Sequence, residues 1–285
     1  MEERNIRVAE WQPEKSGEYQ KERKLDVVYG PINSRRLGLS LGINPIQPIE
    51  DGERPFACNW ACVYCQYGAE SLDESIQYGR VRFSTLDEIG EGLEKRLSSN
   101  EHYDSVTICG PTEPALHPQF NDIVGLVVGM RNRYRPETAT SLFTNATRLA
   151  DKDVYPLDFV FMKLDAGNEE VFKMFNRARG TNYEQLITNL RTARVKRKII
   201  QTAVIDGEDG NLNEGNLRDY IERIREIAPD EVHLYPLLYK PFPNFDLKAI
   251  TREELEELGK VVSASTNTSV KTFSDPVNIG QEFRY

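Results

Sequence analysis

The sequence has no long apolar run. No stretch of its 285 residues approaches the roughly 20 consecutive apolar residues that a membrane-spanning helix needs. Residues 1–5 are mostly charged and lack the apolar core of a secretory signal. These absences argue against a membrane protein and a secreted one, and we expect a cytoplasmic protein.

Positive charge is also scarce. The 36 Lys and Arg residues face 45 Asp and Glu residues, which gives a formal net charge of −9 and a pI of about 5.1. Proteins that bind nucleic acid along its backbone need Lys and Arg to neutralise phosphates. The composition therefore disfavours that class. We interpret the densest basic stretch, Arg191–Lys198, as a solvated face.

Cysteine and histidine are rare, and the placement of the cysteines is informative. Three of the four cysteines, Cys58, Cys62 and Cys65, lie within eight residues. Soft sulfur ligands select zinc or iron–sulfur clusters. A structural zinc site needs four protein ligands, and no fourth is obvious because Cys109 is distant in the sequence. Three cysteines suit a [4Fe–4S] cluster with one open iron. The alternatives are a zinc knuckle, a disulfide pair with a spare thiol, and unrelated core cysteines.

The pattern CxxxCxxC, with the aromatic Tyr64 before its last cysteine, resembles the radical S-adenosylmethionine (radical SAM) superfamily. The resemblance implies that Cys58, Cys62 and Cys65 ligate a [4Fe–4S] cluster whose open iron binds the amino and carboxylate groups of S-adenosylmethionine (AdoMet). It also implies a one-electron donor such as flavodoxin or ferredoxin. The electron cleaves AdoMet to methionine and a 5′-deoxyadenosyl radical. Tyr64 is expected to pack against the adenine.

Flanking segments resemble one branch of this superfamily, the wyosine-synthase-like iron–sulfur oxidoreductases. Residues 29–44 read YGPINSRRLGLSLGIN, and residues 66–68 after the cysteines match that branch too. The second half of the first segment, Leu39–Asn44, alternates as a strand does. Arg35 and Arg36, in the first half of that segment, are adjacent, and paired arginines suit bidentate binding of a carboxylate or phosphate. An interdomain salt bridge is the alternative.

Beyond the cysteines, β-rich runs alternate with amphipathic helices. Strands are predicted at 105–109, 140–144, 158–164, 199–205 and 232–237, and helices at 86–97, 117–130, 182–194, 217–227 and 252–263. Thr85 is predicted to cap the first helix. This alternation indicates an α/β fold with a parallel sheet, and the resemblance implies the partial (β/α)6 TIM-like barrel of the radical SAM type. We expect an N-terminal arm at 1–27, the core at 28–262 and a C-terminal extension at 263–285 with a strand at 269–273.

Active sites of α/β barrels lie at the carboxyl ends of the strands, so the residues there form the predicted cofactor pocket. The resemblance assigns AdoMet binding to seven residues: Tyr64, Gly110, Thr112, Glu113, Asn145, Asp165 and Leu237. Glu113 should hold the AdoMet ammonium, whereas Thr112 stands where the branch has glycine. Strand alternation places Lys163 and Asp165 on one face, and Lys163 is predicted to contact substrate. We interpret His233 as a core or lumen histidine rather than a metal ligand.

Cys109 ends the strand predicted at 105–109, where the branch more often has a small residue such as serine. If its thiol faces the barrel lumen, it could donate a hydrogen atom to a substrate radical. The alternative is a buried cysteine that acts as a small hydrophobe.

These features favour an enzyme that abstracts hydrogen from a small metabolite, nucleotide or natural-product intermediate. The branch resemblance supports modification of a tRNA base as an alternative, but the acidity and the lack of cysteines for a second cluster oppose it. A non-catalytic iron–sulfur or zinc protein is the other alternative. It does not account for Glu113, Asn145 and Asp165 at three separate strand ends.

Overall fold

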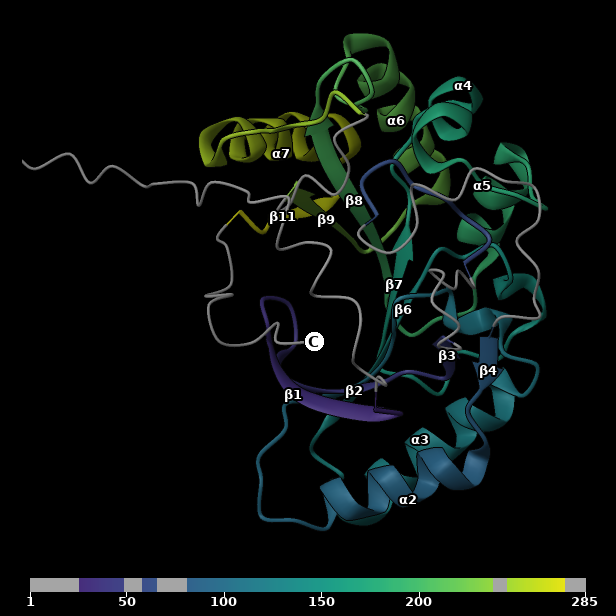
Figure 1. The fold of residues 1–285 in the computed structure, drawn as a ribbon. Helices are drawn as coiled ribbons and strands as arrows, with labels where there is room; N and C mark the ends of the chain where they lie inside the picture. The colour runs from purple at the N-terminus through teal and green to yellow at the C-terminus, as the bar shows by residue number, and fades with distance from the viewer. Residues whose placement is uncertain (1–25, 49–57, 66–80, 238–244, 275–285) are drawn as a thin grey trace, which may run out of the picture.

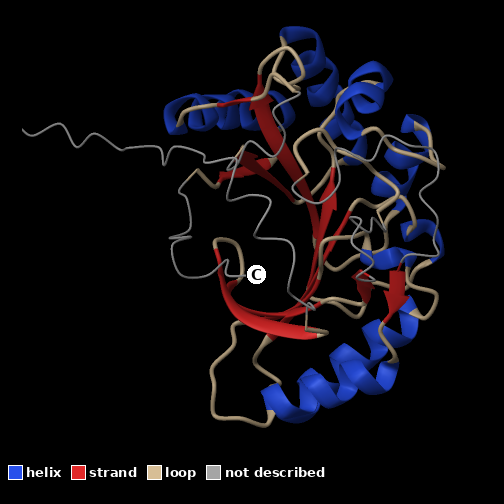
Figure 2. Cartoon of the chain, in the orientation of Figure 1, coloured by secondary structure: helices blue, strands red, loops and turns tan. Residues whose placement is uncertain are grey.

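The computed structural model describes residues 26–48, 58–65, 81–237 and 245–274, which form a curved sheet with helices on its convex side (Figures 1 and 2). The strands are β1 (Val28–Ser34), β2 (Gly38–Ile43), β3 (Ile46–Pro48), β4 (Val81–Phe83), β5 (Ser105–Ile108), β6 (Ala139–Thr144), β7 (Phe159–Lys163), β8 (Lys198–Asp206), β9 (Glu231–Pro236), β10 (Lys248–Ala249) and β11 (Ser269–Thr272). The α-helices are α2 (Leu86–Leu97), α3 (Phe120–Tyr134), α4 (Glu169–Val171), α5 (Tyr183–Thr192), α6 (Glu214–Ile227) and α7 (Arg252–Thr266). Short helical turns are η2 (Pro114–Leu116), η3 (Leu149–Asp151) and η4 (Phe172–Asn176).

The main sheet has the strand order β1-β2-β5-β6-β7-β8-β9-β11. β1 is antiparallel to β2, and all later neighbours along this path are parallel. β10 adds an antiparallel pair to β8, and β3 with β4 forms a separate ribbon. Because β1 and β11 are the two edges of the path, the sheet is a partial barrel. This confirms the predicted fold class.

The strands are deeply buried because helices cover the outer face of the sheet. All four residues of β5 and seven of the nine in β8 are buried. The inner face carries polar side chains as well. The hydroxyl of Thr107 lies 2.7 Å from that of Ser40 and 2.8 Å from that of Ser141, on the face opposite Val106 and Leu142. The barrel lumen is thus lined in part by hydrogen-bonding groups.

Local signals explain most helix limits. Helix α2 has the predicted bounds, and Thr85 forms a capping box with Glu88. The prediction that the next helix starts at 117 was wrong. α3 begins at Phe120, because Pro118 disfavours helical backbone at the preceding residue, His117, whose ψ is 130°. No helix within the described residues is long and apolar enough to cross a membrane.

Two predicted segments, the lead-in and the C-terminal strand, form the edges of the main sheet. The predicted C-terminal strand is β11, which pairs with β9 in the main sheet. The start of the lead-in is β1, whose Tyr29 is paired with Gly42 on β2. A Cβ at Gly42 would lie 2.4 Å from the Tyr29 ring, so only glycine leaves room for that ring. The predicted arm at 1–27 lies outside the described residues except for positions 26 and 27.

Candidate active site

The cysteine loop at 58–65 is attached to the segment that follows β7. Backbone hydrogen bonds run from Ala61 N to Asn176 O (3.1 Å), from Val63 N to Phe175 O (3.0 Å) and from Arg179 N to Asn59 O (2.8 Å). That segment contains η4, a π-helical turn, and such turns are frequent at functional sites. The loop therefore takes its shape from a distant part of the chain.

Two aromatic side chains of the cysteine loop, Trp60 and Tyr64, pack against neighbouring residues. Trp60 is buried, donates from Nε1 to Thr147 Oγ1 at 2.9 Å, and packs edge-on against Phe172. Tyr64 packs against Phe175 with ring centroids 5.1 Å apart. Cys62 lies between these two anchored residues, and Cys58 and Cys65 lie just outside them.

Two of the three thiols, those of Cys58 and Cys62, lie in surroundings that raise their pKa and so favour the protonated form. Burial raises the pKa of Cys62 to about 12, and burial followed by the nearby Glu113 carboxylate raises the pKa of Cys58 well above its usual range. Side-chain amides face the sulfurs: Asn145 Nδ2 lies 3.8 Å from Cys58 Sγ, and Asn176 Nδ2 lies 3.5 Å from Cys62 Sγ. Amide donors of this kind stabilise the negative sulfurs that a bound metal creates.

Three thiols on one loop are the donor set that a [4Fe–4S] cluster with one open iron uses. Within the described residues, no group of three or more His, Cys, Asp or Glu side chains is arranged to hold one metal ion. In a [4Fe–4S] cluster each cysteine binds a different iron, so the thiols need to surround a cluster-sized volume. His233 Nε2 pairs with Glu231 Oε2 at 2.8 Å, and its Nδ1 is buried without a partner within the described residues. Its interpretation as a lumen histidine agrees with that contact.

Glu113 lies after β5 and is almost fully buried. Its Oε1 accepts from Thr144 Oγ1 (2.7 Å) and Ala115 N (3.0 Å), and its Oε2 accepts from Asn145 N (2.6 Å). Burial raises the pKa of Glu113 to about 7, while these hydrogen bonds act in the opposite direction. The carboxyl ends of β5 and β6 thus meet here, as the barrel argument predicted. A carboxylate has about four lone-pair positions, which leaves one for a cationic ligand.

The turn before Glu113 contains buried polar atoms without partners. Thr112 Oγ1 and both side-chain amide atoms of Asn44 are buried and make no hydrogen bond within the described residues. Gly110 has φ +155°, and a Cβ there would lie 2.4 Å from Asn44 Oδ1. Buried polar groups are nearly always hydrogen-bonded, so these atoms fit a polar ligand such as AdoMet. Asn44 was not among the predicted site residues; its position directly after β2 was the available signal.

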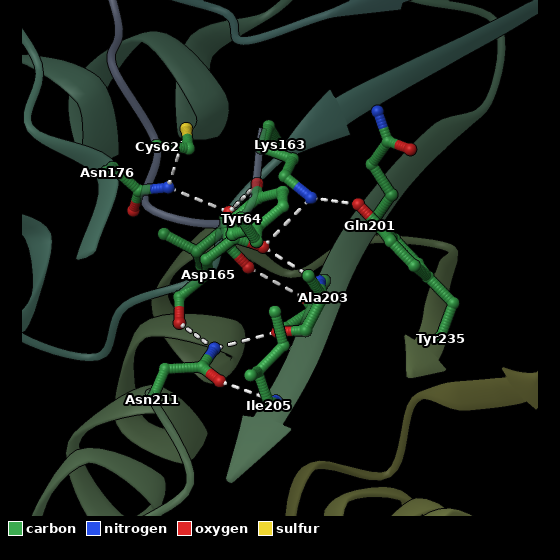
Figure 3. Close-up of polar contacts among 12 residues, drawn as sticks. Cys62, Tyr64, Lys163, Asp165, Asn176, Gln201, Ala203, Ile205, Asn211 and Tyr235 are labelled. Atoms are coloured by element: carbon green, nitrogen blue, oxygen red, sulfur yellow. Dashed lines mark hydrogen bonds and ion pairs between the residues drawn. The ribbon is translucent and has the colours of Figure 1, made fainter. Parts of the chain in front are cut away.

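Asp165 is the centre of a buried polar network (Figure 3). Its Oδ2 accepts from Tyr64 Oη (2.7 Å) and Asn176 Nδ2 (2.8 Å), and its Oδ1 accepts from Ala203 N (2.8 Å) and pairs with Lys163 Nζ (3.0 Å). The predicted placement of Lys163 and Asp165 on one face is therefore confirmed. The network connects the cysteine loop to β8 through one carboxylate.

Lys163 projects into the lumen and is only 8% exposed. Figure 3 shows its ammonium directed at Tyr235, whose hydroxyl accepts its hydrogen bond. The ammonium also lies 5.0 Å from the centroid of the Tyr64 ring. Burial lowers the pKa of Lys163, but the Asp165 carboxylate and Tyr235 outweigh burial and hold the pKa above its usual value. Lys163 is a cation in this structure.

The remaining predicted residues lie at the same end of the barrel. Cys109 Sγ lies 2.9 Å from Tyr29 Oη, and burial raises the pKa of this thiol to about 11. Leu237 follows β9 and packs, partly buried, against the main core. Asn145 also donates from Nδ2 to Asn59 Oδ1 at 2.8 Å, within the cysteine loop. Predicted residues from three strand ends, Glu113 after β5, Asn145 after β6 and Asp165 after β7, thus lie against the cysteine loop.

Comparison with known proteins gives a family match and several relatives. Residues 55–214 match the model of the radical SAM superfamily. A protein named GTPase Obg from Brachyspira hyodysenteriae is 28% identical over 249 residues, which are 85% of this chain and 34% of that protein. The chain therefore spans about a third of that relative. A UPF0026 protein from Synechocystis sp. is 27% identical over 272 residues, 86% of this chain and 95% of that protein.

Two solved structures show the likeness of fold. A radical SAM methyltransferase from Sphaerobacter thermophilus has a TM-score of 0.59 and 15% identity over 84% of this chain and 67% of its own. TYW1 with a lysine–pyruvate adduct bound has a TM-score of 0.57 and 12% identity over 79% of this chain and 73% of its own. At these identities the likeness shows the fold alone.

Proposed function

The chain belongs to the radical SAM superfamily, whose members use a [4Fe–4S] cluster and AdoMet, and on this premise we propose that it abstracts hydrogen from a small metabolite, nucleotide or natural-product intermediate. In this family the bound cofactors together supply the 5′-deoxyadenosyl radical. The protein's own residues bind the cofactors, orient the substrate and exclude water.

The observation that carries the proposal is that the Glu113 carboxylate lies near Cys58 of the cysteine loop. The turn that leads to Glu113 also holds buried polar atoms without partners, in Thr112 and in the neighbouring Asn44. Cys58, Cys62 and Cys65 would hold the cluster. Glu113 would use its remaining acceptor position for the AdoMet ammonium. Thr112 and Asn44 would hydrogen-bond other polar groups of AdoMet, which would remove the cost of leaving buried atoms unpaired. Tyr64, Gly110, Asn145 and Leu237 complete the proposed AdoMet pocket.

Asp165 and Lys163 are assigned different parts of the site. All four contacts of the Asp165 carboxylate are to protein groups, so contact with the AdoMet ribose would require one of them to be exchanged. Lys163 is proposed to contact substrate, because its ammonium faces the lumen beside Tyr235. The raised pKa of Lys163 favours a role as a positive charge over one as an amine nucleophile.

Cys109 is proposed as the hydrogen-atom donor that completes the product. Its S–H would give a hydrogen atom to the substrate radical, leaving a thiyl radical. One electron from the one-electron donor and one proton from solvent would restore the thiol. In Cys109→Ser, cluster content, AdoMet binding and 5′-deoxyadenosine formation should persist while the normal product is lost. Full product formation by that variant would return Cys109 to a packing role.

A second candidate function is modification of a tRNA base, supported by the branch-like sequence at 29–44 and opposed by the net charge of −9. The two are separated by anaerobic reconstitution of the cluster with a reduced flavodoxin or ferredoxin. 5′-Deoxyadenosine is then measured by mass spectrometry with small candidate substrates or bulk tRNA. A gel shift with bulk tRNA at physiological salt gives an independent measure. Stimulation by tRNA alone, with a gel shift, would reject the small-substrate proposal.

A further inference from the structure

Arg36 lies in the turn between β1 and β2, and its side chain extends into the barrel. Its guanidinium carbon lies 5.6 Å from the ring centroid of Phe143 on β6, 4.7 Å from that of Tyr235 on β9 and 5.3 Å from that of Phe273 after β11. The next residue, Leu37, is buried with Phe161 and Ile199. The turn is thus packed into the barrel, and aromatic rings from β6, from β9 and from the residue that follows β11 surround the cation.

Among the described residues, no carboxylate pairs with Arg36. Its one side-chain hydrogen bond within the described residues runs from Nη1 to Gln201 Oε1 at 3.2 Å, and its Nε is buried without a partner. Burial lowers the pKa of Arg36 to about 10, so the side chain stays charged at neutral pH. Aromatic rings attract a cation but accept few of its N–H groups. The guanidinium therefore retains in-plane donors for another acceptor.

Two buried carboxylates of the described barrel strands and strand ends, Asp165 and Glu231, are already paired. Asp165 is paired with Lys163 at 3.0 Å. Glu231, at the other end of the barrel, contacts His233 at 2.8 Å and Lys271 at 3.0 Å, and also pairs with Arg197. Arg36 is half-buried, and its buried Nε without a partner is costly. A bound anion would offset that cost, and the lumen position of the guanidinium makes substrate the natural source of the anion.

We infer that Arg36 binds a carboxylate or phosphate group of the substrate inside the barrel. The inference rests on the proposed function and names the chemical class of its substrate. Tyr235 connects this position to the reaction end of the lumen, because the Lys163 ammonium lies 4.5 Å from the same ring over which Arg36 stacks. A substrate with one anionic group would thus be held by Arg36 and directed toward Lys163.

The test measures binding of small anions to the reconstituted protein by isothermal titration calorimetry at constant ionic strength. Acetate and inorganic phosphate are the two probes, and they distinguish a carboxylate site from a phosphate site. We expect saturable binding of at least one probe to the wild type. Arg36→Gln should weaken it about tenfold or more, as expected for loss of a charge-assisted hydrogen bond. Arg36→Lys should retain part of the affinity, because it keeps the charge and loses the planar fork.

Arg133→Gln is the matched control, because Arg133 also stacks on an aromatic ring, that of Tyr134 at 5.0 Å, but is exposed on α3. That control should bind the probe as the wild type does. The absence of saturable binding to the wild type would overturn the inference even if the Arg36 variants fail to fold. Folded Arg36→Gln that binds the anion with the affinity of the wild type would overturn it too. An equal loss of AdoMet affinity and anion affinity in that variant would also overturn it, because the effect would then not be specific to the anion site. Anion binding at Arg36 without any AdoMet cleavage would count against the proposed function and not against this site.

Discussion

Replacing Asp165 by Asn should destabilise the protein more than any other single isosteric change in the site. Each carboxylate oxygen accepts two donors: Oδ1 from Ala203 N and Lys163, and Oδ2 from Tyr64 and Asn176. An asparagine amide in either orientation turns its NH2 group toward two donors. It also removes the counter-charge of Lys163, whose side chain is only 10% exposed.

The magnitude follows from the buried ion pair. Removing one partner of such a pair costs about 3–5 kcal/mol, since the other charge stays buried. The lost hydrogen bonds overlap with this cost and are not added to it. At roughly 2–4 °C per kcal/mol for domains slightly smaller than this one, the midpoint of thermal unfolding should fall by about 6–20 °C.

The assay is thermal unfolding of wild type, Asp165→Asn, Lys163→Met and the double variant. If the unpaired ammonium of Lys163 causes most of the loss, the double variant should be more stable than Asp165→Asn alone. Asp158→Asn is the matched control, because Asp158 pairs with Arg131 and Lys196 but its side chain is 27% exposed. It should cost about 1 kcal/mol. A midpoint for Asp165→Asn within about 3 °C of the wild type would refute the reasoning.

Three further predictions concern the cofactors and pH. Alanine at any one of the three loop cysteines should abolish the visible absorbance of the cluster and AdoMet cleavage; a full spectrum with normal turnover would contradict the ligand assignment. Glu113→Gln should weaken AdoMet binding about ten- to a hundredfold in a direct titration, whereas Thr144→Val, which removes one hydrogen bond to Glu113 and no charge, should weaken it less; equal affinities would reject this role. Burial lowers the pKa of His233 to about 4 from an unfolded value of 6.5, so its unfolded form takes up a proton first as pH falls. The free energy of unfolding should therefore decline by about 2–3 kcal/mol from pH 6.5 to 4 because of His233. Urea titrations at several pH values should show a smaller decline for His233→Gln, and an equal decline would disprove this role of His233.

The sequence predicts the order of strands and helices well because each signal is local. Thr85 and Glu88 form a capping box three residues apart, and the alternation of β7 places Lys163 beside Asp165. The barrel rule also predicts that Glu113 and Asn145 meet, since both follow parallel neighbours, and their contact is 2.6 Å.

The rest of the site depends on contacts between distant segments. Asn176 faces Cys62 only because η4 carries the cysteine loop. Asn44 lies beside Gly110 only because β2 and β5 are in register. Neither residue has a local pattern that distinguishes it from a turn asparagine. Arg36 had a local signal in its pairing with Arg35, but its ring contacts come from residues more than a hundred positions further along the chain and could not be predicted.

The attachment of the cysteine loop to η4 has a consequence for biosynthesis. Cys62 and Asn176 are separated by 114 residues, and the ribosome adds about 5–20 residues per second. The loop therefore leaves the ribosome about 6–20 s before its supporting segment exists. During that interval the Cys62 thiol lacks the Asn176 amide that faces it in the folded protein. Cluster insertion into the finished geometry has to wait until the chain beyond residue 176 has emerged, so oxidation of the nascent thiols competes with maturation in time.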